Sequence, residues 1–450
     1  MRPINSSFGW SRRSKLLATS LAVLTASGGT LLTQPAASAS EHSVTITVFA
    51  STGNLPYPWQ IADFQKAYPN IRVDLTTVPF GEFYTKTAVL AASSNPPDVF
   101  AVDQPTIPNL AAGHVILPLN KYLSPSYINS LTAAARADYT YKGQIYSTGP
   151  TDTALALFYN KTYLNKLGIH PPTDLATAWT WQQALSAFQK CQTEYSKPGR
   201  TVWGLAPTTF GNGTPGFDYI SNLFLRSEGS PTAPQSSSAR KTFEAISPSG
   251  TTVAGYLNSP QAIAGAQFYQ DLFQKYKVSP TTGIPNALLD GEACFDMNTS
   301  NDVKTIQQAH VKFQWGVTPW PHFRTPIVHN GSNEIAVGAK TKHLTQALDF
   351  VKFISSPSQQ TQIFQNTGYL PVIKSLYTSI PALKIAPWNV FTQELSKWGE
   401  PRPVTPHYLQ YSQVVTTAMR NIADGAPVKS TLDQAVSQLN PLLAQPAGAL

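Results

Sequence analysis

Val44-Thr45-Ile46-Thr47-Val48 alternates apolar and polar side chains over five residues, which is the period of a β-strand. Two further strand patterns follow at 71–75 and 99–102. The stretches between them, 56–68 and 82–92, place apolar side chains three to four residues apart, as amphipathic helices do. An order of strand, helix, strand, helix, strand is typical of parallel strands joined by helical crossovers. The sequence therefore predicts an α/β fold.

The strand and helix patterns begin again after residue 146, so the chain has more elements than one such sheet uses. They comprise strands at 154–158, 202–205, 316–317 and 335–337 and helices at 161–167, 181–190, 259–277 and 344–355. The stretch 230–250 is rich in Ser, Pro, Gly and Thr and is interpreted as a surface excursion. A chain of this length is too long for one core and long enough for two domains of ordinary size.

The first 39 residues have the composition of an export signal. Four basic residues precede an apolar stretch at 16–32, and Ala37-Ser38-Ala39 offers the small side chains that a signal peptidase needs. A retained anchor is the alternative, although the stretch falls short of the ~20 apolar residues that a span requires. Ser11-Arg12-Arg13 leaves both twin-arginine and general secretory export open. We expect an exported protein, periplasmic or extracellular, without a lipid-anchor cysteine.

Charged residues make up 12% of the chain, about half the usual share. The formal net charge of +8 would fall to +4 without the four basic residues of the export signal. The sequence contains no run of clustered Lys and Arg residues of the kind that binds nucleic acid. One hypothesis for the shortage of charge is an acidic external medium, in which carboxylates lose their charge. A stability maximum near neutrality with collapse at about pH 4 would contradict that hypothesis.

The two cysteines, Cys191 and Cys294, are far apart in the sequence. Export permits a disulfide, and a loop of about 100 residues could contribute ~4 to 5 kcal/mol by chain entropy. Of the two arrangements, we expect two separate buried thiols rather than a disulfide. Neither cysteine has metal-ligand spacing with His or Cys, so no zinc site and no cofactor are predicted.

Several short segments, taken in order, resemble the extracellular solute-binding proteins that supply solutes to ATP-driven sugar importers, a family similar to maltose-binding protein. None is specific alone, but the similarity as a whole runs over nearly the entire chain after the export signal, from about residue 44 to residue 443. They are Tyr68-Pro69-Asn70-Ile71-Arg72-Val73, Pro96-Pro97-Asp98-Val99-Phe100, Gly143-Gln144-Ile145-Tyr146, Tyr159-Asn160-Lys161, Gly291-Glu292-Ala293, Trp315-Gly316-Val317 and Gly368-Tyr369-Leu370-Pro371-Val372.

The resemblance implies a two-lobed, periplasmic-binding-protein-like α/β fold of type II, with discontinuous lobes joined by a hinge. Lobe one would comprise 42–149 and 320–367, and lobe two would comprise 153–316 and 368–450. The implied protein is a monomer without enzymatic activity. It would capture a small solute, a carbohydrate above all, in the cleft between the lobes and deliver it to the membrane permease of an ABC importer.

Candidate ligand-binding residues follow from sugar chemistry. Carboxylates and amides can exchange hydrogen bonds with hydroxyl groups, and aromatic rings can lie against sugar faces. Open α/β sheets bind ligands beyond the carboxyl ends of their strands. The residues at such positions are Asn54, Glu82, Asp103, Asp152, Asn212, Asp218, Asn298, Asn330 and Tyr369. Trp320 and Trp388 are further candidates as aromatic platforms.

Two alternatives stay open. A secreted glycoside hydrolase would need a pair of carboxyl groups across the scissile bond, and no catalytic motif surrounds any acidic residue here. The same fold could instead bind a glycerol phosphate, a phosphodiester or another small solute. A phosphate would favour an arginine clamp, for which Arg226, Arg324 and Arg402 are candidates.

Overall fold

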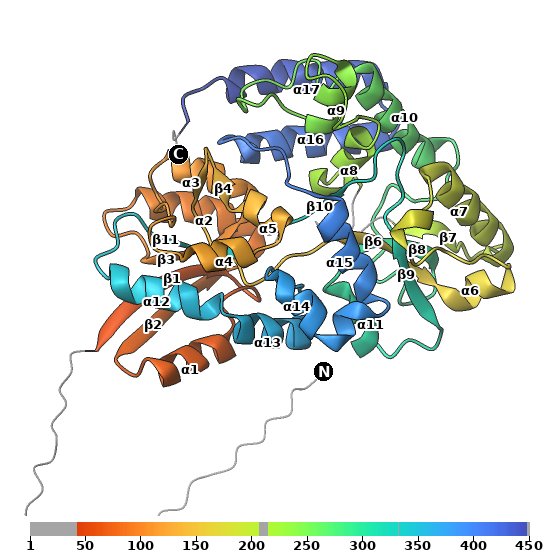
Figure 1. The fold of residues 1–450 in the computed structure, drawn as a ribbon. Helices are drawn as coiled ribbons and strands as arrows, with labels where there is room; N and C mark the ends of the chain where they lie inside the picture. Colours follow the sequence, from red (N-terminus) through yellow and green to blue (C-terminus); the bar gives the residue numbers. More distant parts are fainter. Residues whose placement is uncertain (1–42, 207–214, 332, 448–450) are drawn as a thin grey trace, which may run out of the picture. The chain divides into compact units, whose positions relative to one another are not determined.

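The computed structural model describes residues 43–206, 215–331 and 333–447 (Figure 1). The predicted export signal and Asn212 lie outside these residues. Two four-stranded sheets organise the described chain. Among the described residues, no helix is both long and apolar enough to cross a membrane.

The first sheet has the strand order β11-β3-β1-β2. Its strands are β1 (Val44–Ser51), β2 (Ile71–Val78), β3 (Val99–Asp103) and β11 (Asn333–Val337). Strand β1 pairs in parallel with both β2 and β3, whereas β11 is antiparallel to β3. Helices α1 (Pro58–Ala67) and α2 (Phe80–Ala92) make the crossovers. The predicted parallel units of residues 44–102 are therefore confirmed.

Helices cover both faces of the first sheet because its strands carry apolar side chains on both faces. Ile46 and Val48 pack with α1, α12 (Leu344–Ile354) and α13 (Pro357–Thr367). Phe49 points to the opposite face, where it packs with α2 and α3 (Ile107–Ala112). We call this sheet and the elements packed on it the first lobe. Its other elements are α4 (Pro125–Ser130), α5 (Ala133–Asp138), β4 (Thr140–Tyr141) and β5 (Gln144–Ile145).

The second sheet has the order β7-β8-β6-β9 and is mixed. Its strands are β6 (Leu155–Asn160), β7 (Trp203–Ala206), β8 (Ala293–Thr299) and β9 (Trp315–Pro319). Strand β6 is antiparallel to both of its neighbours, and all its residues are buried. We call this sheet and the elements packed on it the second lobe.

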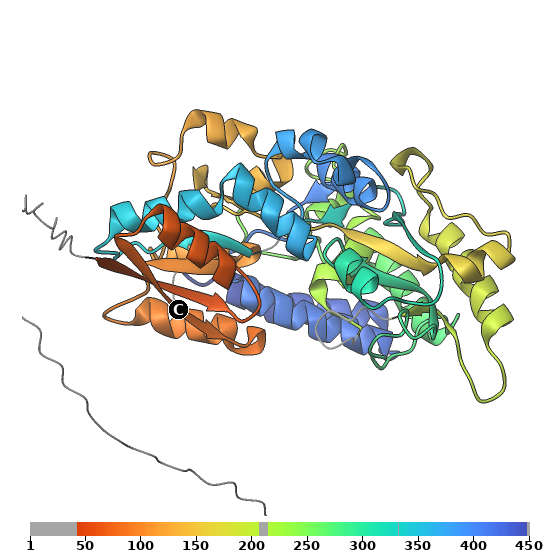
Figure 2. The same ribbon diagram turned by 90° about the horizontal axis from the view of Figure 1, so that it is seen from below.

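The second lobe is rich in helices, many of them from the C-terminal part of the chain (Figures 1 and 2). Helices α8, α10, α16 and α17 pack against one another, and α7 packs on β7. The elements are α6 (Lys161–Lys166), α7 (Trp181–Tyr195), α8 (Asp218–Arg226), α9 (Ser238–Glu244), α10 (Pro260–Gln274), α11 (Asp302–Gln308), α14 (Lys374–Ser379), α15 (Trp388–Lys397), α16 (Tyr408–Ala423), α17 (Val428–Leu443), β10 (Val328–His329) and β12 (Gly399–Glu400).

Three segments that run between the lobes lie side by side and are joined by main-chain hydrogen bonds. Thr148 and Ile335 exchange bonds of 2.9 and 2.7 Å, and Asp152 and Leu370 exchange bonds of 2.8 and 2.9 Å. We call residues 148–153, the described residues of 330–335 (330–331 and 333–335) and residues 368–372 the crossing segments. The two lobes are thus connected by short segments with little regular secondary structure, the kind of link that can absorb a rotation between domains.

Some sequence interpretations are corrected by the packing. The stretch 230–250 contains α9, and Phe243 and Ile246 are buried in the second-lobe core. Trp320 is 1% exposed, with its ring 5.3 Å from that of Trp181, and Trp388 is 6% exposed. Neither tryptophan is an open platform for a ligand, because both fill the second-lobe core.

Carboxyl groups without a cationic partner are buried at the crossing segments. Asp152 accepts bonds from the main-chain N–H groups of Gly331 (2.9 Å) and Thr153 (2.8 Å), and Asn330 donates to Asp138 (2.5 Å). One oxygen each of Asp138, Asp152 and Glu334 lacks a hydrogen-bond partner among the described residues. Burial raises the pKa of Asp152 to about 7 and raises those of Asp138 and Glu334 well above the usual range. These groups therefore favour protonation in the folded state.

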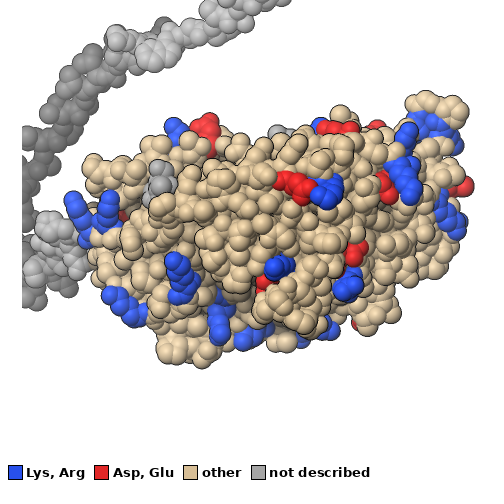
Figure 3. Space-filling model, turned by 90° about the horizontal axis from the view of Figure 1, so that it is seen from above, with Lys and Arg blue, Asp and Glu red and all other residues tan. Residues whose placement is uncertain are grey.

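Charged side chains on the surface are sparse. Figure 3 shows Lys, Arg, Asp and Glu side chains scattered over one face of the molecule, with broad uncharged areas between them. This view fits the low share of charged residues in the sequence. It also shows no dense basic field on that face of the kind that a nucleic-acid-binding protein presents.

The expectation of two separate thiols is wrong, because Cys191 and Cys294 form a disulfide. Cys191 lies on α7 and Cys294 on β8, both fully buried, and α7 packs across the second sheet. The bond therefore fixes that helix to its sheet. A pairing over a sequence separation of 103 residues depends on tertiary packing, which spacing alone does not reveal.

Replacing both cysteines, Cys191→Ala with Cys294→Ala, is predicted to lower the free energy of unfolding by about 2–5 kcal/mol, because the unfolded chain loses its longest-range constraint. Urea unfolding of the double variant and of the oxidised wild type measures the difference. A thiol titration of the wild type, unfolded without reductant, checks the disulfide itself. Two reactive thiols per chain would contradict it.

The buried carboxyl groups predict a pH dependence of stability. Their pKa values are raised in the folded state, so the folded protein keeps protons that the unfolded chain releases above about pH 4. The free energy of unfolding should therefore fall as the pH rises from about 4 through 7. Melting temperatures across that range measure the slope, which Asp152→Asn should reduce. An identical slope in the variant would contradict the assignment.

Candidate ligand-binding cleft

A cavity of about 330 Å³ lies beside the crossing segments and is lined from both lobes. This volume is at the lower end of the range of small-molecule sites, which is about 300–1,000 Å³. The lining residues are Asn54, Phe80, Tyr84, Asp103, Thr153, Phe217, Tyr219, Thr299, Asn301, Gly331, Asn333, Tyr369 and Arg402. Of the first-lobe residues among them, Asn54 follows β1, Phe80 and Tyr84 follow β2, and Asp103 ends β3, as the general rule for open sheets requires, while Asn333 begins β11.

Aromatic rings form much of the cavity wall. Phe80 begins α2 and is 48% exposed, which is unusual for so large an apolar side chain. Its ring lies 5.5 Å from that of Tyr84, one turn further along the helix. Phe217 and Tyr219 lie on the second-lobe side, with ring centroids 6.3 Å apart. Rings from both lobes thus offer flat apolar surfaces to a ligand.

The charged groups of the cavity are paired with each other. Asp103, the last residue of β3, receives two bonds from Arg402, from Nη2 to Oδ1 at 2.7 Å and from Nη1 to Oδ2 at 3.3 Å. Tyr84 donates its hydroxyl to the same carboxylate at 2.6 Å. Burial and the Asp103 carboxylate raise the pKa of Tyr84 well above its usual value. This ion pair joins a first-lobe strand to the segment that precedes α16.

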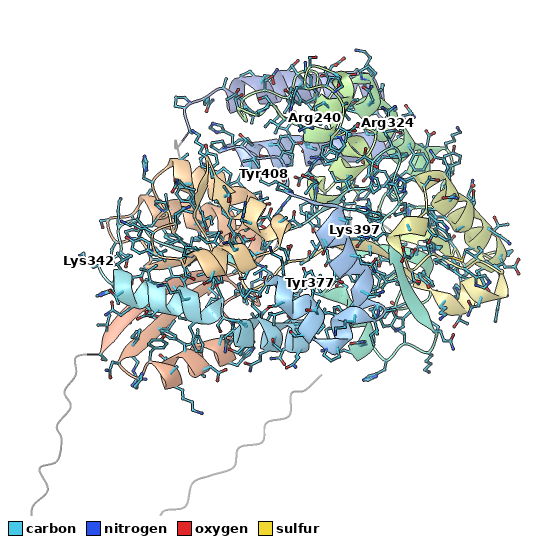
Figure 4. The ribbon with its side chains drawn as sticks, in the orientation of Figure 1. Arg240, Arg324, Lys342, Tyr377, Lys397 and Tyr408 are labelled. Atoms are coloured by element: carbon cyan, nitrogen blue, oxygen red, sulfur yellow. A yellow bond between two sulfur atoms is a disulfide. The ribbon has the colours of Figure 1, made fainter. Side chains whose placement is uncertain are left out.

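The Arg402 guanidinium is held between two aromatic rings. It lies 5.3 Å from the ring of Tyr219 and 5.6 Å from that of Tyr408. Tyr408 begins α16, at the end of that helix nearest the first lobe (Figure 4), and donates its hydroxyl to Asp218 at 2.5 Å. Asp218 also accepts a bond from Ser412 at 2.7 Å. Asp218 therefore acts through Tyr408 to fix the position of Arg402.

The structure brings three of the predicted site residues to the cavity wall, namely Asn54, Asp103 and Tyr369. Asp152 and Asn330 lie at the crossing segments next to the cavity but are buried in their own hydrogen bonds. These two residues would hold the lobes together rather than touch a ligand in this conformation.

The other predicted residues do not line the cavity. Glu82 is exposed on α2, and Asp218 is buried behind Tyr408. Asn298 lines a separate small cavity of about 50 Å³ with Asp296 and Asp302. Asn212 lies outside the described residues.

Sequence reasoning missed several lining residues. Tyr84 falls within the predicted helix 82–92 and Phe80 lies just before it, and their position after the strand pattern at 71–75 was the available indication. Arg402 was considered only as a phosphate clamp, and its pairing with Asp103, about 300 residues earlier, has no local sequence pattern. Phe217 and Tyr219 flank the candidate residue Asp218 and line the cavity, whereas Asp218 does not.

Comparisons with known proteins identify the family to which the chain is similar. The model of the family described as bacterial extracellular solute-binding protein matches residues 59–388. The multiple sugar-binding protein of Streptococcus mutans is 24% identical over 351 residues, which cover 76% of this chain and 78% of that protein.

Solved structures are similar in fold. The substrate-binding protein Lmo0181 of Listeria monocytogenes, in complex with cycloalternan, has a TM-score of 0.74 and 19% identity, covering 89% of this chain and 99% of the other. UgpB of Mycobacterium tuberculosis, in complex with glycerophosphocholine, has a TM-score of 0.71 and 19% identity, covering 89% and 98%. These likenesses confirm the predicted two-lobed type II fold.

The family match extends over well more than half of the chain and describes binding proteins, so the prediction of a solute binder rather than an enzyme is confirmed. The chain belongs to the bacterial extracellular solute-binding proteins.

Proposed function

We propose that this protein captures a sugar or short oligosaccharide in the cavity between its lobes. The observation that carries the proposal is the lining itself, which combines aromatic rings with amide and hydroxyl groups from both lobes. A sugar needs both kinds of contact, because its faces carry C–H groups and its edges carry hydroxyls. The sugar-binding relative from Streptococcus mutans supports the same ligand class.

Ligand capture would work by differential binding to two conformations. A sugar that contacts Phe80 and Asn54 in the first lobe and Tyr219 in the second would favour the closed arrangement. We propose that 153–316 and the C-terminal part belong to the second lobe, together with 320–329, because Trp320, Ile327 and Val328 pack in its core. The middle crossing would then lie at 330–335.

The expected setting of the protein is outside the cytoplasmic membrane, as its family name states. We propose that residues 1–39 direct its export to the periplasm or cell surface. There the monomeric, ligand-loaded protein would dock on the permease of an ABC importer. No step in this cycle changes a covalent bond of the solute.

A glycerol phosphate or phosphodiester is the second candidate ligand. The similarity in fold to UgpB, whose structure contains glycerophosphocholine, favours it. Arg402 is also present at the cavity wall, as a phosphate site would require. Its pairing with Asp103 weighs against this alternative.

Melting temperatures of the protein with a panel of mono- and oligosaccharides, and with glycerol 3-phosphate, test the proposal. A ligand at 100 times its dissociation constant should stabilise the fold by about 2.7 kcal/mol. An upward shift with at least one sugar is expected. Absence of any shift across the sugars would refute the proposed ligand class.

Phe80→Ala should weaken binding of the most stabilising sugar roughly tenfold, or about 1.4 kcal/mol, because it removes an aromatic face from the cavity wall. Isothermal titration calorimetry measures the change. Ile385→Ala, at a residue that is 64% exposed and outside the cavity lining, is the control and should bind like the wild type. Equal affinities in the two variants would show that Phe80 does not contact the sugar.

A further inference from the structure

The charge balance of the cavity is unusual for a site with an arginine in its wall. Among the described residues that line the cavity, Arg402 is the one cation and Asp103 the one carboxylate. They are bonded to each other, and their side chains are only 7% and 11% exposed. The cavity therefore offers a ligand a neutral pair instead of an unpaired positive charge.

The geometry of the pair leaves Arg402 little freedom to leave Asp103. Two of its N–H groups donate to the carboxylate and a third, Nε, donates to Gln104 at 3.3 Å. Tyr219 and Tyr408 lie against the guanidinium, which fixes its plane. Turning Arg402 toward a phosphate would break a buried ion pair, and leaving a buried carboxylate unpaired is strongly unfavourable.

The other arginines that could have formed a phosphate clamp lie elsewhere. Arg226 is 4% exposed and bonds to the main chain of Phe243 and Pro401 and to His329. Arg324 is exposed and labelled in Figure 4, away from Tyr408. Neither lines the cavity. The further titratable side chain that interacts with both members of the pair from α8, that of Asp218, is a carboxyl group and adds no positive charge beside Arg402.

We propose that the Asp103–Arg402 ion pair determines the ligand class, because it makes the cavity accept uncharged, hydroxyl-rich solutes and reject phosphate esters. This inference rests on the proposed function of the cavity as the solute site. A phosphate ester would lose its hydration, face the Asp103 carboxylate and find the arginine charge already neutralised. The two N–H groups of Arg402 that remain can still donate to ligand hydroxyls.

The test is a gain of function. Asp103→Asn keeps the side-chain shape and removes the negative charge, which leaves Arg402 with a net charge facing the cavity. The variant should bind glycerol 3-phosphate at least roughly tenfold more tightly than the wild type, because charge-assisted bonds to the phosphate become available. Asp74→Asn makes the same change in net charge at an exposed residue of β2 and should behave like the wild type.

Calorimetric titration with glycerol 3-phosphate decides between the outcomes. A gain in Asp103→Asn but not in Asp74→Asn supports the inference, and equal affinities in both variants overturn it. If Asp103→Asn fails to fold, the melting temperature of the wild type with glycerol 3-phosphate tests the inference instead. Stabilisation of the wild type by millimolar glycerol 3-phosphate would overturn the inference, and its absence would support it.

This experiment separates the inference from the proposed function. Sugar binding by the wild type without a gain in Asp103→Asn would leave the sugar carrier intact and remove the role of the ion pair. A gain in Asp103→Asn without any sugar binding by the wild type would preserve the role of the pair and refute the sugar as ligand.

Discussion

The main-chain pairing of the three crossing segments is the constraint on which the rest of the structure depends. Thr148 with Ile335, and Asp152 with Leu370, hold three stretches of chain together where they pass between the lobes. Because these bonds involve backbone atoms, they fix the relative position of segments whose side chains then build the cavity. Asp152 strengthens the junction by accepting bonds from Gly331 and Thr153. Buried carboxyl groups at such a junction are costly when ionised, so the junction favours acidic conditions, which fits the low surface charge.

Binding chemistry follows from what the two lobes bring to this junction. The first lobe supplies groups at strand ends, and the second supplies the aromatic residues around Arg402. The Asp103–Arg402 pair connects both contributions, with Tyr84 on one side and the Tyr408–Asp218 contact on the other. A cleft built in this way has aromatic surface and hydrogen-bonding groups but no unpaired charge among its described lining residues. Such a site can hold a polyol by many modest contacts and release it when the lobes separate.

The sequence predicted the fold well where structure is local. The alternation at 44–48 and the helical spacing at 56–68 correspond to β1 and α1, because periodicity follows from which side of an element is buried. The candidate site was predictable in part, since Asn54 lies just after a strand and Asp103 at the end of one, and both line the cavity. Contacts between distant segments were not predictable. Trp320 is a candidate platform by sequence but fills the core, and nothing near Cys191 in the sequence indicates Cys294 as its partner.

A crystal structure of the protein grown with its most stabilising sugar would test the central claim most directly. The account predicts the sugar in the cavity beside Arg402, in contact with Phe80 on one lobe and Tyr219 on the other, with the Asp103–Arg402 pair intact. A sugar bound elsewhere, for example in the depression beside Tyr163 and Phe313, or in contact with one lobe alone, would contradict it.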